Sequence, residues 1–178
     1  MAANRQDSHR QRCYVAVIGG STAPPAMLAL ARTVGQEIAR RGGVLICGGL
    51  GGVMQAAAQG AQEAGGVVIG ILPGPDRAQG NPFLTYSIVT NLGHARNMLI
   101  AHSADGLIAV AGSYGTISEA AIALKLGKPV IGLATEWQLA GMRTATSTSE
   151  AIDWLWQKLA IKEDKSNHGA EESVSRKP

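Results

Sequence analysis

Short, continuous apolar segments alternate along this chain with segments of helical periodicity, and this alternation is the feature that most restricts its fold. Unbroken apolar runs are typical of parallel strands that are buried on both faces. Because right-handed crossovers place the intervening helices on both sides, we predict a Rossmann-like α/β domain, a doubly wound parallel sheet with helices on both faces. The expected strands are 14–18, 44–47, 67–72, 107–110 and 130–133, with a further short one at 87–90.

Helical patterns fill the spaces between these runs, and the length of 178 residues favours a single domain. We expect one nucleotide-binding domain over 13–160, a disordered basic arm over 1–12 and a disordered polar tail over 161–178. The expected helices are 27–41, 52–64, 94–103, 116–126 and 150–159, and a loop is expected over 134–148.

The distribution of charge argues against a large nucleic-acid interface. The net charge is +3, but residues 13–160 carry nine Lys/Arg against eight Asp/Glu, so most of the excess lies in the N-terminal arm. No apolar run is long enough to span a membrane and no signal peptide is recognisable, so we expect a cytoplasmic protein. Cys13 and Cys47 lack nearby Cys or His partners, which predicts buried, reduced thiols and no metal site.

Three glycine-rich loops follow expected strands, at 19–22, 48–52 and 112–116. Glycine lets the backbone approach a ligand closely, and the N-terminus of a following helix favours an anion such as phosphate. Tight turns alone would also explain one such loop, but three at the same edge of a sheet favour a phosphate-binding site. The dinucleotide fingerprint G-x-G-x-x-G and the P-loop Gly-Lys-Ser/Thr are both missing, which argues against NAD-type and ATPase chemistry.

Three ordered motifs make the comparison with known families specific. The segments Gly48-Gly-Leu-Gly-Gly-Val-Met54, Gly93-His-Ala-Arg96-Asn97 and Gly112-Ser-Tyr-Gly-Thr-Ile-Ser-Glu119 resemble the Lonely Guy (LOG) superfamily. This superfamily contains cytokinin nucleoside-monophosphate phosphoribohydrolases. The Gly-Ile-Leu-Pro-Gly stretch at 70–74 and the Arg-Asn pair resemble more closely a sister branch that includes molybdenum-cofactor carrier proteins.

The resemblance implies a set of ligand residues and, if the chain is a hydrolase, two catalytic residues. Arg96 would contact the substrate, and Glu119 would act at the glycosidic carbon. Ala111, Ser113 and Asn97 stand where the hydrolase motifs have proline, glycine and lysine. The predicted ligand or phosphate contacts are Gly20, Ser21, Gly48, Gly49, Gly51, Gly52, Met54, Arg96, Asn97, Gly112, Ser113, Gly115, Thr116 and Glu119.

Structural roles compete with functional ones at several of these positions. The spacing Thr116-x-x-Glu119 fits a helix capping box, with Thr116 as N-cap. Arg96 fits either a phosphate contact or a solvated or subunit-pairing residue, and His94 is expected at the surface or in an interface. The segment 116–126 is apolar nearly all round and 52–64 is rich in small residues, which favours a homodimer or higher homo-oligomer.

Three functions remain open from the sequence. The first is a binding protein for a phosphorylated, nucleotide-like small molecule, with molybdenum cofactor as bound cargo and no resident cofactor required. The second is a phosphoribohydrolase that cleaves the N-glycosidic bond of a purine (cytokinin-type) nucleoside 5′-monophosphate. The third is a nucleic-acid module of the DNA-processing type, against which the near-neutral folded part argues.

Overall fold

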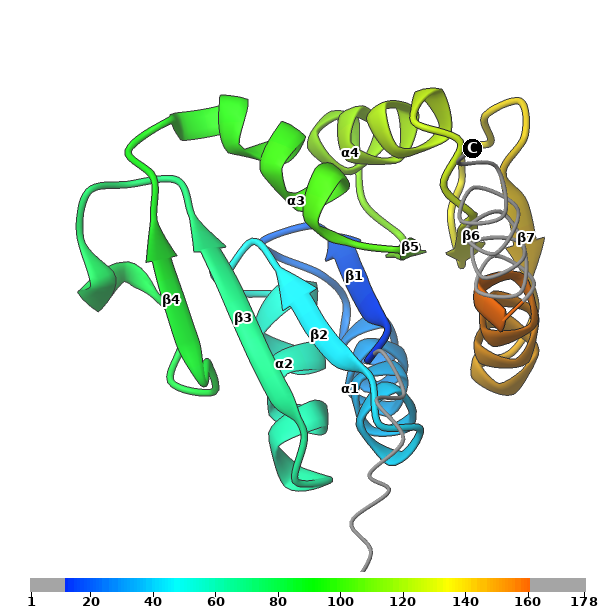
Figure 1. The fold of residues 1–178 in the computed structure, drawn as a ribbon, viewed down its shortest axis with the longest axis horizontal. Helices are drawn as coiled ribbons and strands as arrows, with labels where there is room; N and C mark the ends of the chain where they lie inside the picture. Colours follow the sequence, from blue (N-terminus) through cyan, green and yellow to red (C-terminus); the bar gives the residue numbers. More distant parts are fainter. Residues whose placement is uncertain (1–11, 161–178) are drawn as a thin grey trace, which may run out of the picture.

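A single parallel sheet forms the centre of the protein in a computed structural model, which describes residues 12–160 (Figure 1). Its strand order in this part of the chain is β4-β3-β2-β1-β5-β6-β7, and every neighbouring pair is parallel. The predicted Rossmann-like α/β class is therefore confirmed. The strands are β1 Tyr14–Gly19, β2 Val44–Cys47, β3 Val67–Leu72, β4 Tyr86–Val89, β5 Gly106–Val110, β6 Val130–Leu133 and β7 Arg143–Ala145.

Helices cover both faces of this sheet, as the continuous apolar strands require. Helices α1, α2 and the helix over 148–160 share one buried apolar core, whereas α3 and α4 pack on the opposite face. Alternate residues of the central strands divide between the two cores: Val15 and Val17 face the first, and Ala16 and Ile18 the second. The labelled helices are α1 Pro25–Arg40, α2 Val53–Glu63, α3 Asn97–Ser103 and α4 Tyr114–Lys125, with short 3₁₀ turns η1 Arg77–Gln79 and η2 Gly93–Arg96.

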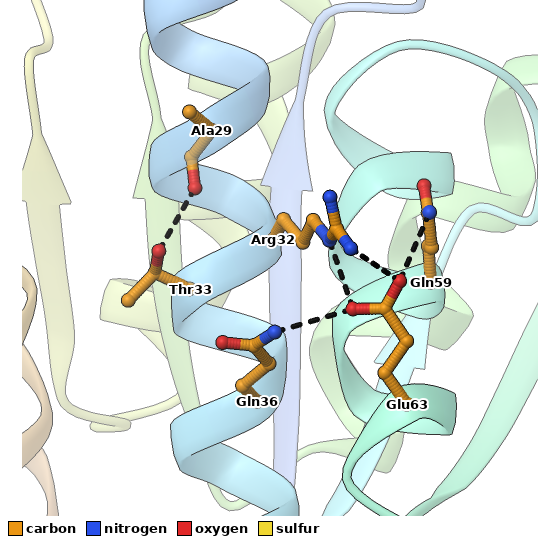
Figure 2. A network of polar contacts seen from close by, with 6 residues as sticks. All are labelled: Ala29, Arg32, Thr33, Gln36, Gln59 and Glu63. Atoms are coloured by element: carbon orange, nitrogen blue, oxygen red, sulfur yellow. Dashed lines mark hydrogen bonds and ion pairs between the residues drawn. The ribbon is translucent and has the colours of Figure 1, made fainter.

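Close backbone contact explains the small residues of α2. A Cβ at Gly35 of α1 would meet the backbone of Ala57, and one at Gly60 of α2 would meet the backbone of Arg32. Beside this contact Glu63 accepts hydrogen bonds from Arg32 at 2.6 and 2.8 Å and from glutamines on both helices, as Figure 2 shows. The small residues of this helix therefore serve packing within one chain.

Several sequence-based assignments need correction. The predicted helix over 94–103 is divided into η2 and α3, because a tighter 3₁₀ turn precedes the α-helix. The predicted loop over 134–148 contains β7, an edge strand too short and too exposed to show an apolar pattern. Helices α1 and α4 and the helix over 148–160 each begin two residues earlier than predicted. The arm over 1–11 and the tail over 161–178 lie outside the described residues.

Candidate functional site

A cavity of about 280 Å³ opens at the carboxyl ends of the central strands. It lies where β1 and β5 are neighbours but their following helices, α1 and α4, pass to opposite faces of the sheet. Such a switch point leaves a crevice between the two connections, and ligands of open α/β sheets bind there. Most of the predicted ligand residues line this cavity, namely Gly20, Ser21, Gly48, Met54, Arg96, Asn97, Ser113, Gly115, Thr116 and Glu119.

The remaining predicted contacts stand in the same loops but outside the residues that line the cavity. Gly49, Gly52 and Gly112 have φ values of +75°, +64° and +88°, so the turns themselves require glycine. A Cβ at Gly52 would also meet the backbone of Gly20, which joins the first two loops. Gly51 has an ordinary φ and space for a Cβ 3.4 Å from the Ser21 carbonyl oxygen.

Arg96 is buried at the end of η2 with its guanidinium against the backbone of the second loop. Its exposed fraction is 8%, and any Cβ at Gly48 would collide with the guanidinium. Within the described residues, Nε and Nη1 of Arg96 have no hydrogen-bond partner. Buried donors without hydrogen-bond partners are costly, so these two nitrogens are available to an acceptor inside the cavity.

Glu119 projects from α4 toward the same arginine. Its Oε1 lies 3.6 Å from Nη1 of Arg96, and its exposed fraction is 7%. Burial raises the pKa of Glu119 to about 7, although the charge of Arg96 acts in the opposite direction. Burial also lowers the pKa of Arg96, and a guanidinium nevertheless stays charged. The cavity therefore holds one permanent cation and one carboxyl group that titrates near neutrality.

Of the two roles left open for Thr116 and Glu119, the structure does not form the capping box. Helix α4 begins at Tyr114, so its N-cap is Ser113 and Thr116 already lies inside the first turn. The side chain of Ser113 makes no capping hydrogen bond, and Ser113, Tyr114 and Gly115 are all exposed. The N–H groups at this end are thus left for solvent or a ligand.

Asn97 connects the element that carries Arg96 to α4. Its Nδ2 donates to Oγ of Ser118 at 2.9 Å and more weakly to the carbonyl oxygen of Gly115 at 3.4 Å. Ser118 in turn donates to the same carbonyl at 2.7 Å. Asn97 therefore lines the cavity and also fixes the position of α4 relative to η2.

The thiol of Cys47 lies at the end of β2, near Arg96 and Glu119. It is fully buried, and burial raises its pKa to about 11, so it stays protonated near neutral pH. Cys47 forms no disulfide in the described part of the chain, and Cys13 is partly exposed. No group of three or more His, Cys, Asp or Glu residues in the described part is arranged to hold a metal ion, and no helix there is long and apolar enough to cross a membrane.

Comparison with known proteins places this arrangement in a family. Residues 12–162 match the SLOG cluster4 family. The chain belongs to that family. An uncharacterised protein of Archaeoglobus fulgidus is 47% identical to this SLOG cluster4 protein over 140 residues, which cover 79% of this chain and 92% of the relative.

Solved structures of similar fold include two proteins named for molybdenum cofactor. The molybdenum cofactor binding protein of Rippkaea orientalis aligns with a TM-score of 0.80 and 36% identity, over 84% of this chain and 99% of that one. The molybdenum cofactor carrier protein of Chlamydomonas reinhardtii aligns with a TM-score of 0.77 and 37% identity, over the same shares. DNA processing protein A of Helicobacter pylori, at 20% identity and a TM-score of 0.64 over 82% of this chain and 81% of that one, shares only the fold with this SLOG cluster4 protein.

Three residues outside the predicted set also shape the site of this SLOG cluster4 protein. Asn81 accepts from Phe83 N–H and donates to the Leu50 carbonyl at 3.0 Å, which ties the connection after β3 to the second loop. Trp137 donates from Nε1 to the Gly112 carbonyl at 3.0 Å and so fixes the third loop. His94, expected at the surface or in an interface, is exposed and lines the cavity edge. Asn-Pro at 81–82 signals a turn, but no sequence pattern shows which distant loop these side chains contact.

Proposed function

We propose that this protein binds a phosphorylated, nucleotide-like small molecule in the cavity at the switch point, and that molybdenum cofactor is its cargo. The observation that carries the proposal is Arg96, a buried guanidinium with two nitrogens that lack hydrogen-bond partners, beside the exposed N-terminus of α4. A phosphate would accept hydrogen bonds from the guanidinium and from backbone N–H groups, and the helix dipole favours its charge.

The residues present fit a phosphorylated pterin of this kind. Arg96, Ser113 and Gly115 would hold the phosphate, and Ser21 and Met54 line the same cavity on the side of the first two loops. The cavity volume of about 280 Å³ is near the lower end for ligand pockets. Because the cavity is open to solvent, the part of a larger ligand that it does not enclose could extend outward. The bound cofactor would supply its redox chemistry to another protein, while this chain would bind, orient and shield it.

The backbone of the third loop departs from the hydrolase motif. Ala111 has a φ of +48°, a value that proline cannot adopt because its ring holds φ near −65°. The hydrolase motif that the sequence resembles has proline at this position. The third loop of this chain therefore follows a backbone path that the proline of the hydrolase motif would not allow, which argues against the hydrolase.

Hydrolysis of a nucleoside 5′-monophosphate is the second candidate, and Glu119 is the observation that favours it. A carboxyl group with a pKa near 7 can donate or accept a proton at neutral pH, and as the anion it would stabilise positive charge on the ribose. Arg96 would then hold the 5′-phosphate. We do not propose nucleic-acid binding, because the near-neutral folded part carries no basic stripe.

We further propose that the protein is a homo-oligomer. The large apolar or aromatic residues with exposed fractions of 38–88% include Leu92, which precedes η2, Met98 and Leu99 on α3, and Tyr114 on α4. Residues of this kind, clustered on neighbouring elements, are typical of a protein–protein interface. Light scattering coupled to size-exclusion chromatography tests this, and a monomer at micromolar concentration would contradict it.

One experiment separates the two candidate functions. Small molecules released from the purified protein are identified by mass spectrometry, and the protein is then incubated with adenosine 5′-monophosphate and its prenylated analogue. An intact co-purified pterin phosphate with no release of free base supports the carrier. Release of free base by the wild type but not by Glu119→Gln would refute a carrier-only role and make the protein a phosphoribohydrolase.

A further inference from the structure

We propose that anion binding in this cavity is coupled to protonation of Glu119, so that the protein takes up a proton when it binds its ligand and releases it when the ligand leaves. The inference rests on the proposed function, because it requires an anionic group at Arg96. It adds a regulatory property to that site: affinity that falls as pH rises.

The geometry places a ligand anion and the carboxylate in competition for one guanidinium. Arg96 Nη1 lies 3.6 Å from Glu119 Oε1, and both side chains are about nine-tenths buried. The guanidinium nitrogens without hydrogen-bond partners are Nε and Nη1, and Nη1 is the one that faces Glu119. An anion that accepts a hydrogen bond from Nη1 therefore comes close to the carboxyl group, with little solvent between them to screen two negative charges.

Protonation of Glu119 removes this conflict. A neutral carboxyl group no longer repels the incoming anion, and its O–H can donate a hydrogen bond. The ionised carboxylate of Glu119 instead partly neutralises the positive charge of Arg96 and so weakens its attraction for the ligand anion. The ligand therefore binds better to the protonated form, and by linkage its binding raises the proton affinity of Glu119.

Among the ionisable groups around Arg96 and Glu119, Glu119 is the buried group that changes its protonation between pH 6 and 8. From β2, Cys47 approaches with a pKa raised by burial to about 11, so it remains a neutral thiol between pH 6 and 8. From η2, His94 lies at the exposed edge of the cavity and is the second group to control for. The lining residues from β1, α2, their loops and the rest of α4 carry no ionisable side chain.

The expected change in affinity with pH follows from the pKa of Glu119. Burial places the pKa of Glu119 at about 7 in the free protein. If only the protonated form binds, the apparent dissociation constant rises about tenfold between pH 6 and pH 8. Proton uptake on binding is then close to zero at pH 6 and close to one per site at pH 8.

Inorganic sulfate is the probe, because it is a tetrahedral dianion whose charge does not change between pH 6 and 8. Its affinity is measured by calorimetry at both pH values and constant ionic strength, and proton uptake is followed with an electrode in weakly buffered solution. We expect the wild type to bind about tenfold more weakly at pH 8 and to take up nearly one proton. Glu119→Gln should bind without this pH dependence and more tightly than the wild type at pH 8, whereas His94→Gln should retain it.

Two results would overturn the inference in distinguishable ways. Sulfate binding that is independent of pH and takes up no proton in the wild type refutes the coupling and leaves the proposed function standing. Failure of sulfate to bind at either pH refutes both the coupling and the phosphate-binding role of Arg96. Because the wild-type pH profile and proton count need no variant, the test does not depend on whether Glu119→Gln folds.

Discussion

Replacing Gly48 with alanine should damage the ligand site while leaving the fold intact. The new Cβ would collide with the end of the Arg96 side chain and with no other group as closely. A flexible guanidinium can move away, whereas the backbone of the second loop need not shift. The substitution therefore displaces the buried cation from its place in the cavity without removing it.

The expected loss of affinity follows from the contact that Arg96 would make. A charge-assisted hydrogen bond contributes about 1.5–3 kcal/mol, and each 1.4 kcal/mol corresponds to about a tenfold change in affinity. Gly48→Ala should therefore weaken binding roughly ten- to hundredfold. Crowding in the loop should reduce the free energy of unfolding by at most about 1–3 kcal/mol.

Gly51→Ala is the matched control, because it makes the same change in the same loop. A Cβ there would lie 3.4 Å from its nearest neighbour, an ordinary contact, and the residue does not line the cavity. Calorimetric titration should use adenosine 5′-monophosphate or a phosphorylated pterin, whichever the wild type binds more tightly, with urea unfolding alongside. A folded Gly48→Ala protein that binds as tightly as the wild type would refute the role assigned to Arg96.

Three further predictions concern stability. Because burial raises the pKa of Glu119, its neutral form stabilises the fold at low pH, and this contribution is lost as pH rises through about 7. The free energy of unfolding of the wild type, measured in urea, should therefore fall relative to that of Glu119→Gln between pH 5 and 8. The same dependence of this free energy on pH in both proteins would contradict the prediction. Gly60→Ala should cost about 1–3 kcal/mol, since its Cβ would meet the backbone of α1, and an unchanged thermal midpoint would be inconsistent with that packing. Lys128→Met should cost about 1.5–3 kcal/mol, because Nζ donates to three carbonyls at the end of α3 at 2.6–2.8 Å; a loss below about 0.5 kcal/mol in urea unfolding would show that these bonds contribute little.

The sheet was predictable because each buried strand must be apolar on both faces. The runs at 44–47, 67–72 and 130–133 coincide with β2, β3 and β6. A strand buried on both faces leaves a strong pattern of continuous apolar residues. Strand β7 left no such pattern, because it has only three residues and two of them are exposed.

The candidate site was predictable as a set of loops but not as a set of contacts. Gly48 was expected to let a ligand approach the backbone closely. In the structure the group that approaches it is the guanidinium of Arg96, from a segment 48 residues further along the chain. Thr116-x-x-Glu119 matched a local capping pattern, yet α4 begins earlier and leaves Glu119 to face Arg96. Contacts between distant segments decide these roles, and local spacing does not contain them.

Native mass spectrometry of the protein purified from molybdenum-replete cells tests the central claim most directly. The account predicts an adduct with the mass of one pterin phosphate cofactor per chain. Arg96→Gln should lose the adduct, whereas Arg143→Gln, at an exposed arginine on β7 that does not line the cavity, should keep it. A wild-type protein that never carries a phosphorylated ligand, or an Arg96→Gln protein that carries it as fully as the wild type, would contradict the account.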